Sequence, residues 1–146
     1  MISASVIIFL VAQVQKPASL YAHLGQYSAS MMLKKASPEM KGQLWWGSVE
    51  DPRFIVERLQ IKKGTNQVFV PRSVYSDLAR VTKMDFQKIK GQLRLTIQGG
   101  AGSASDGYTC YIYIKGEDVV RRRVESRTFP QYQYEETSYV SKEIPG

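Results

Sequence analysis

Tyrosine and arginine residues alternate with apolar residues in two neighbouring segments near the C-terminal end of the chain. The first segment, YTCYIYI, spans residues 108–114, and the second, VVRRRVES, spans residues 119–126. The short polar sequence KGED joins them, so the two segments are typical of an antiparallel β-hairpin. Guanidinium and phenol groups that stack on one face of such a hairpin can hold a phosphate, a sugar or a nucleobase.

The register of this hairpin decides which side chains meet. A turn of Gly116 to Asp118 places these candidate partner-binding residues on the outer face: Tyr113 opposite Arg121, Tyr111 opposite Arg123, and Lys115 at the edge. A two-residue turn would shift the register and break this arrangement. The alternative is a solvated face, on which arginine side chains cover the tyrosine rings and remain in water.

Arg122 is the exception in this register, because it falls on the inner face with Val120 and Val124. A buried guanidinium group needs a carboxylate partner, which Glu135 or Glu136 in the next segment could supply. A position near the edge of the sheet would remove that need, and we favour the edge.

Two adjacent tryptophans, Trp45 and Trp46, are a second candidate for partner binding. Adjacent residues of a strand point to opposite faces, so one ring should be buried and the other could be exposed. An exposed tryptophan could anchor a protein or a carbohydrate. The alternative is that other parts of the fold cover both rings, since large aromatic side chains are mostly buried.

The glycine-rich stretch of residues 99–107 could approach a phosphate closely through its backbone N–H groups. A phosphate-binding loop also needs a following Lys-Ser or Lys-Thr and a helix, whereas this stretch leads into the expected strand at Tyr108. We therefore expect an ordinary mobile hairpin loop.

Residues that could support catalysis are few. Cys110 is the single cysteine and His23 the single histidine, so the chain can form neither an internal disulfide nor a cysteine-based zinc site. Cys110 falls on the inner face of its strand, where a thiol behaves as a small hydrophobe. Nothing recommends a pair among the carboxylates that could meet in space: Asp77, Asp85, Glu57 and Glu125. We expect no enzyme, no cofactor and no metal.

The chain opens with an uncharged apolar run, ISASVIIFLVAQV, at residues 2–14. It is shorter than the ~20 residues that a membrane-spanning helix needs, so no transmembrane anchor is expected. Its length fits a secretory signal peptide over residues 1–16, although no basic segment precedes it. The alternative is a buried first strand, because the run is rich in β-branched residues.

The remaining segments must position these candidates. Residues 43–49 and 54–61 have strand signals, and residues 20–33 fit a helix and a strand equally well. Residues 73–81 predict one short helix of two to three turns, with Ser73 as its N-cap. The apolar stripe of that helix should pack on the sheet.

Period-two alternation over the rest of the chain predicts a mainly β fold of α+β type. We expect a single domain over residues 17–146, built as a small antiparallel β-barrel or sandwich of about six or seven strands with one short helix. The formal net charge of +7 would attract phosphate polymers, anionic lipid and acidic proteins. The same charge, spread along the chain, also fits a simple aid to solubility.

The region from FIVERLQ to EETSYV is similar in general character to small bacterial envelope proteins, a resemblance that implies no particular activity. The patterns favour an exported binding module, periplasmic or secreted, that engages an anionic or acidic partner. The partner would be a protein or an anionic envelope polymer, and an inhibitor or immunity-type protein is one concrete form. The alternatives are a cytoplasmic small-barrel protein that binds nucleic acid and a structural envelope protein without a small ligand. The sequence patterns do not predict an oligomeric state.

Overall fold

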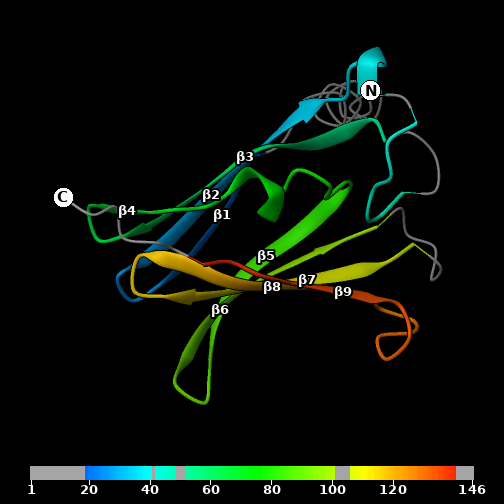
Figure 1. Cartoon of the computed structure of the whole chain (residues 1–146). Helices are drawn as coiled ribbons and strands as arrows, with labels where there is room; N and C mark the ends of the chain where they lie inside the picture. The colour runs from blue at the N-terminus through cyan, green and yellow to red at the C-terminus, as the bar shows by residue number, and fades with distance from the viewer. Residues whose placement is uncertain (1–18, 41, 49–51, 101–105, 141–146) are drawn as a thin grey trace, which may run out of the picture.

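The computed structural model describes residues 19–40, 42–48, 52–100 and 106–140, and it arranges them in two antiparallel β-sheets (Figure 1). The first sheet has the order β1 (Ser19–Leu24), β2 (Tyr27–Lys35), β3 (Phe54–Lys63) and β4 (Asn66–Val68). The second has the order β5 (Val81–Ile89), β6 (Gln92–Gly99), β7 (Tyr108–Lys115), β8 (Asp118–Ser126) and β9 (Tyr134–Ser138). The two sheets do not close into a barrel, and the fold is compatible with a small β-sandwich.

The mainly β prediction is confirmed. The alternation that predicted β6 and β7 holds, because both strands turn their aliphatic side chains into the core and Cys110 lies among them. These residues pack against buried side chains of β2 and β3, among them Met31 and Ile61, each 0% exposed. Burial of apolar side chains from both sheets in one cluster is what holds the sheets together.

The structure has more strands than the sequence predicted. Residues 20–33, which fitted a helix and a strand equally well, form most of the β1–β2 hairpin. The strand β5, which pairs with β6, was not predicted. Nine strands are present in the described part of the chain, where six or seven were expected.

The predicted helix at residues 73–81 is wrong in extent. Only one turn of 3-10 helix, η2 (Arg72–Val74), forms in this segment. The chain then turns and becomes extended at Leu78 and Ala79. An α-helix would require the carbonyl groups of Ser73 and Val74 to accept bonds from residues four positions later. Arg122 takes both carbonyl groups instead.

The other 3-10 turn, η1 (Pro38–Met40), precedes the segment with the two tryptophans. The strand predicted at residues 43–49 is wrong over the described residues 42–48, which form isolated bridges rather than a strand. One bridge joins Trp46 to Leu78, and the backbone turns at Gly47, where φ is +90°. The segment therefore covers one end of the core without joining either sheet.

The predicted export signal, residues 1–16, lies outside the described residues, as do residues 101–105 of the glycine-rich loop. Among the helices of the described ranges, none has the length and apolar character needed to cross a membrane.

Candidate functional site

The predicted cross-strand pairs of the β7–β8 hairpin are confirmed. Tyr113 lies opposite Arg121, and Tyr111 lies opposite Arg123. All four side chains are partly exposed, while their strand neighbours, such as Ile112, are buried. The four therefore share the face of the second sheet that is turned away from the first sheet. We call it the Arg–Tyr face, and it also includes Arg94 of β6 and Tyr134 of β9.

The register arises differently from the way the sequence suggested. Lys115 pairs with Asp118, so the turn contains Gly116 and Glu117 and not three residues. The register then shifts at Val120, an extra residue in β8 that has no partner in β7. Such a β-bulge shifts the register of β8 by one residue. The shift restores the pairing of Tyr113 with Arg121, which the two-residue turn alone would have broken.

Three guanidinium groups of the Arg–Tyr face stack on tyrosine rings. Each Cζ atom lies between 4.1 and 4.4 Å from a ring centroid: Arg94 over Tyr111, Arg121 over Tyr113, and Arg123 over Tyr134. These distances are well within the range of a cation–π contact. The rings hold the flat guanidinium groups in place and leave their outer surfaces turned toward solvent.

Arg94 and Tyr134 were not among the predicted site residues. Arg94 alternates with buried Leu93 and Leu95, which was enough to place it on an outer face. Its position beside Tyr113 depends on the pairing of β6 with β7, across the long connection between them. The alternation of the sequence predicts that Arg94 lies on the outer face, but only the order of the strands shows that it lies beside Tyr113.

Arg123 is held by acceptors of the protein itself. Its guanidinium donates to Glu125 Oε2 at 2.8 Å, to Glu136 Oε1 at 2.9 Å and to the Pro130 carbonyl at 3.1 Å. The hydrogen bonds to Glu125 and Glu136 raise the pKa of Arg123 above its usual value. Arg123 therefore ties β9 and the loop before it to β8, and its charge is compensated.

Arg94 and Arg121 lack such compensation. Arg94 donates through Nε and Nη2 to the neutral Gln87 side chain, at 3.3 and 3.1 Å, and Arg121 stacks on Tyr113. Within the described ranges neither of the two forms an ion pair with a carboxylate. Because Tyr113 pairs with Arg94 on one side and with Arg121 on the other, the three form a row across three strands.

Tyr111 lies in the neighbouring row and remains a neutral phenol. Partial burial, the charge of Glu125 and a hydrogen bond to that carboxylate raise the pKa of Tyr111. Its hydroxyl group therefore donates to Glu125, which also binds Arg123. Because Arg94 stacks on the same ring, Tyr111 links Arg123 and its carboxylate partners to Arg94, which has none among the described residues.

Arg122 lies on the inner side of β8, but not at a sheet edge as we had favoured. It is 3% exposed, and its Nη1 and Nη2 atoms each lie 2.7 Å from a carboxylate oxygen of Asp77. Burial alone would lower the pKa of Arg122, but the hydrogen bonds and charge of Asp77 raise it. Glu135 and Glu136 are engaged by other residues. Arg122 is part of the core and not of a binding surface.

The two tryptophans are both partly buried, so the structure shows neither one fully buried ring with one exposed ring nor two covered rings. Trp46 donates its Nε1–H to Glu135, and its ring lies 6.3 Å from that of Tyr108. Nε1 of Trp45 is buried and has no hydrogen-bond partner among the described residues. Neither ring is presented as an exposed anchor.

Cys110 and His23 bring no reactive group to the Arg–Tyr face. Cys110 is fully buried, and burial raises the pKa of its thiol to about 12. His23 is exposed on β1 of the other sheet. Over the described residues, no group of three or more His, Cys, Asp or Glu side chains is placed to hold a metal ion.

The Arg–Tyr face therefore offers charge and stacking, with two cations open to an external acceptor. Comparison with models of known protein families, with curated proteins and with solved structures finds no match.

Proposed function

We propose that this protein is an exported, non-enzymatic binding module of the bacterial envelope that holds an acidic partner protein on its Arg–Tyr face. The observation that carries the proposal is the row of Arg94, Tyr113 and Arg121 across three strands. Its two guanidinium groups stack on Tyr111 and Tyr113, and neither forms an ion pair with a carboxylate among the described residues. An inhibitor or immunity-type protein is one concrete form of such a module.

Preorganisation favours binding through this row. A free arginine side chain loses considerable rotamer freedom when it is immobilised at an interface. Arg121 already lies on Tyr113, and Arg94 is fixed both by the ring of Tyr111 and by Gln87. The partner would therefore meet N–H groups in fixed positions, where a carboxylate can accept two bonds from one guanidinium group.

The stacking itself favours a protein over single-stranded nucleic acid. Sequence-tolerant binding of single strands relies on bases that stack on exposed aromatic rings. Here the rings of Tyr111 and Tyr113 already carry guanidinium groups. A base could reach these rings only by displacing the guanidinium groups, whereas a carboxylate can bond to the outer edges of the guanidinium groups without moving them.

The test uses two defined fluorescent probes, polyglutamate and oligothymidylate, with fluorescence anisotropy measured over a series of salt concentrations. The variant Arg94→Gln with Arg121→Gln should bind polyglutamate roughly tenfold more weakly, since it loses two charge-assisted contacts. The control variant, Arg58→Gln with Arg72→Gln, removes the same charge from exposed positions elsewhere and should bind as the unchanged protein does.

Equal weakening in both variants would mean that only the net charge matters, and the proposed face would be wrong. Tighter binding of oligothymidylate than of polyglutamate, with a steep loss on adding salt, would support the nucleic-acid alternative instead.

Export rests on the opening apolar run and is tested separately. Mass spectrometry of the protein isolated from its native host should find a mature chain that begins shortly after residue 14. Intact Met1 on the soluble protein would overturn the export part of the proposal and leave the Arg–Tyr face unaffected.

A further inference from the structure

A cleft of about 600 Å³ opens at the end of the sandwich where hairpin turns of both sheets come together. It lies between the start of β2 and the end of β3 on one side and the β5–β6 and β7–β8 turns on the other. Its lining includes four lysines, namely Lys63, Lys88, Lys90 and Lys115. Lys115, which was predicted at the edge of the Arg–Tyr face, also lines this cleft.

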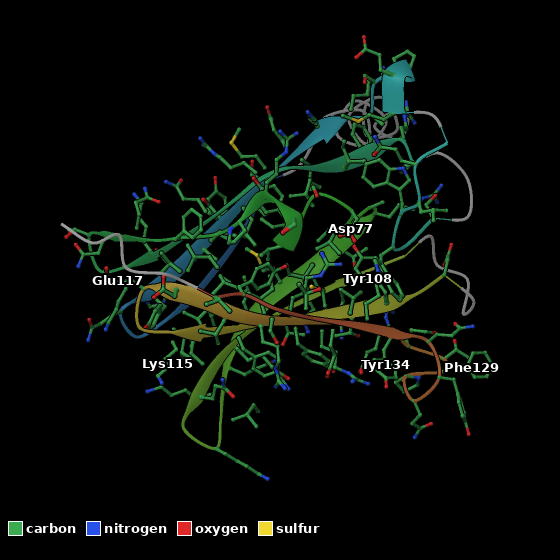
Figure 2. All side chains as sticks on the ribbon, in the orientation of Figure 1. Asp77, Tyr108, Lys115, Glu117, Phe129 and Tyr134 are labelled. Carbon is green, nitrogen blue, oxygen red and sulfur yellow. The ribbon has the colours of Figure 1, made fainter. Side chains whose placement is uncertain are left out.

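The lining of the cleft has an excess of positive charge, although Asp118 stands opposite Lys115 in the β7–β8 ladder. In the described part of the chain, none of the four lysines forms an ion pair, and no Asp or Glu lines the cleft. The nearest acidic residue in sequence to Lys115 is Glu117, which accepts a hydrogen bond from Asn66 Nδ2 at 3.0 Å. Figure 2 shows Glu117 and Lys115 on opposite sides of the β7–β8 turn. Four like charges so placed repel one another, and a bound anion would relieve this.

The wall formed by Tyr27 gives the cleft a fixed shape. The Tyr27 hydroxyl group donates to the Gly116 carbonyl at 3.0 Å, which links the first sheet to the β7–β8 turn. Nζ of Lys63 lies 6.0 Å from the centre of the same ring, at the outer limit of a cation–π contact. The two buried aliphatic residues at the base of the cleft are Leu93 and Ile114. The lysines therefore surround a base of buried aliphatic side chains.

The backbone at Lys90 is also unusual. Its φ angle is +51°, a left-handed conformation that turns usually assign to Gly, Asn or Asp. Lys90 and Gly91 form the two-residue turn between β5 and β6, and both residues line the cleft.

From this cleft we infer a second binding site, separate from the Arg–Tyr face, for a ligand that carries two or more adjacent phosphate groups. Ammonium groups act as compact point charges on flexible stems, so lysines from different turns can gather around neighbouring phosphates. A single phosphate is small compared with a cleft of about 600 Å³, which has room for a larger anion. The phosphates could belong to a soluble oligophosphate or to a lipid headgroup, and the experiment separates these two sources.

The experiment measures binding of inorganic tripolyphosphate by calorimetry and by changes in the backbone amide signals of Gly91 and Gly116. The variant Lys88→Gln with Lys115→Gln should bind roughly tenfold more weakly than the unchanged protein. The control variant, Lys35→Gln with Lys83→Gln, loses the same charge outside the cleft and should bind normally. Orthophosphate should bind much more weakly than tripolyphosphate.

A second arm uses phosphatidylcholine vesicles with and without cardiolipin, a lipid that carries two phosphates. Binding of tripolyphosphate with the expected variant pattern supports a soluble ligand, and the same pattern with cardiolipin vesicles alone supports a lipid headgroup. Binding to neither probe, equal loss in the control variant, or equal affinity for orthophosphate would overturn the inference. The variant Arg94→Gln with Arg121→Gln should keep this site intact, so failure of the Arg–Tyr proposal is recognised separately.

Discussion

Arg122 of β8 and Asp77 of the segment after η2 form a bidentate ion pair between the second sheet and the segment that covers it, with both N–O distances at 2.7 Å. Nη1 of Arg122 also donates to the carbonyl groups of Ser73 and Val74, each at 2.9 Å. Figure 2 shows Asp77 above the second sheet and near Tyr108. One side chain thus fixes the path of a segment that would otherwise have free backbone acceptors.

Removal of Asp77 should be strongly destabilising, because it leaves a buried guanidinium group without its counter-ion. We expect Asp77→Ala to lower the free energy of unfolding by about 3–5 kcal/mol. Urea unfolding at neutral pH measures this loss. Asp85→Ala is the control, since Asp85 pairs with Lys83 at 3.4 Å on the surface, and its effect should be at most about 1 kcal/mol. Similar losses in the two variants would contradict the role assigned to the buried pair.

A methyl group at Gly47 should also destabilise the fold, because Tyr108 occupies the space it would need. A Cβ atom there would lie 2.4 Å from Cε1 of Tyr108 and 2.7 Å from the Ala79 carbonyl oxygen. The Tyr108 hydroxyl group donates to that same carbonyl at 2.7 Å, so neither neighbour can move freely. We expect Gly47→Ala to cost about 3 kcal/mol or more, as for an overpacked core with added backbone strain.

Gly64→Ala separates strain from the steric clash. Gly64 has a φ of +61°, and a Cβ atom there would meet nothing within 4 Å. Its cost should be the backbone term alone, about 1–2 kcal/mol. Equal thermal and urea stabilities of the two variants would mean that the space around Tyr108 is not tightly filled.

The outer face of the β7–β8 hairpin could be predicted from the sequence because alternation is a local property. Tyr111 and Tyr113 alternate with buried residues, and any register that keeps the core intact sends them outward. The bulge at Val120 was not visible in the sequence, since a valine suits a regular strand position equally well. The predicted pairing with Arg121 and Arg123 was therefore correct, although the turn assumed for it was too long.

Contacts between distant segments could not be predicted in this way. Arg122 and Asp77 are 45 residues apart, and periodicity does not tell which distant segment delivers a carboxylate to a buried arginine. The predicted stripe comprised Val74, Leu78 and Val81; the first two are buried at 0% exposure, whereas Val81 is only partly buried and begins β5. An apolar stripe can be buried by a turn as well as by a helix. Arg122 binds the carbonyl groups of Ser73 and Val74, which an α-helix would use for its own hydrogen bonds, and the segment therefore forms a turn.

Burial of Cys110 should make the protein less stable in alkaline solution. The folded state holds the pKa of this thiol at about 12, against 9.0 for an ordinary cysteine. As pH rises from about 9 toward 12, the unfolded chain loses a proton that the folded chain retains, so the free energy of unfolding falls. Cys110→Ala should show a shallower fall over this range in urea titrations.

The same burial predicts that the Cys110 thiol reacts slowly with thiol-specific reagents. A thiol-specific reagent at pH 8 should modify the native protein far more slowly than the urea-unfolded protein, because the thiolate is scarce and inaccessible. Rapid labelling of the native protein, or parallel pH profiles for the unchanged protein and Cys110→Ala, would contradict this assignment. Burial, and to a smaller extent the charge of Cys110, raise the pKa of Tyr108 well above its usual value, so the difference between the two profiles includes the effect of Cys110 on Tyr108.

Arg121 and Arg123 should separate binding from stability, although they are two positions apart on the same face. Arg123 bonds to Glu125, Glu136 and the Pro130 carbonyl group, so Arg123→Gln should cost about 1 kcal/mol of stability and loosen β9. Figure 2 shows Phe129 and Tyr134 at the far end of the sheet from Lys115, in the region that Arg123 secures.

Arg121→Gln should instead leave the free energy of unfolding unchanged to within about 0.5 kcal/mol, because its guanidinium group stacks on Tyr113 without an ion pair among the described residues. The single change should nevertheless weaken polyglutamate binding, since it removes one of the two uncompensated cations. Measured side by side, the two variants should therefore give opposite patterns: loss of stability for Arg123→Gln and loss of affinity for Arg121→Gln. An Arg121→Gln protein that unfolds early, or that binds polyglutamate as tightly as the unchanged protein, would show that Arg121 serves the fold rather than a partner.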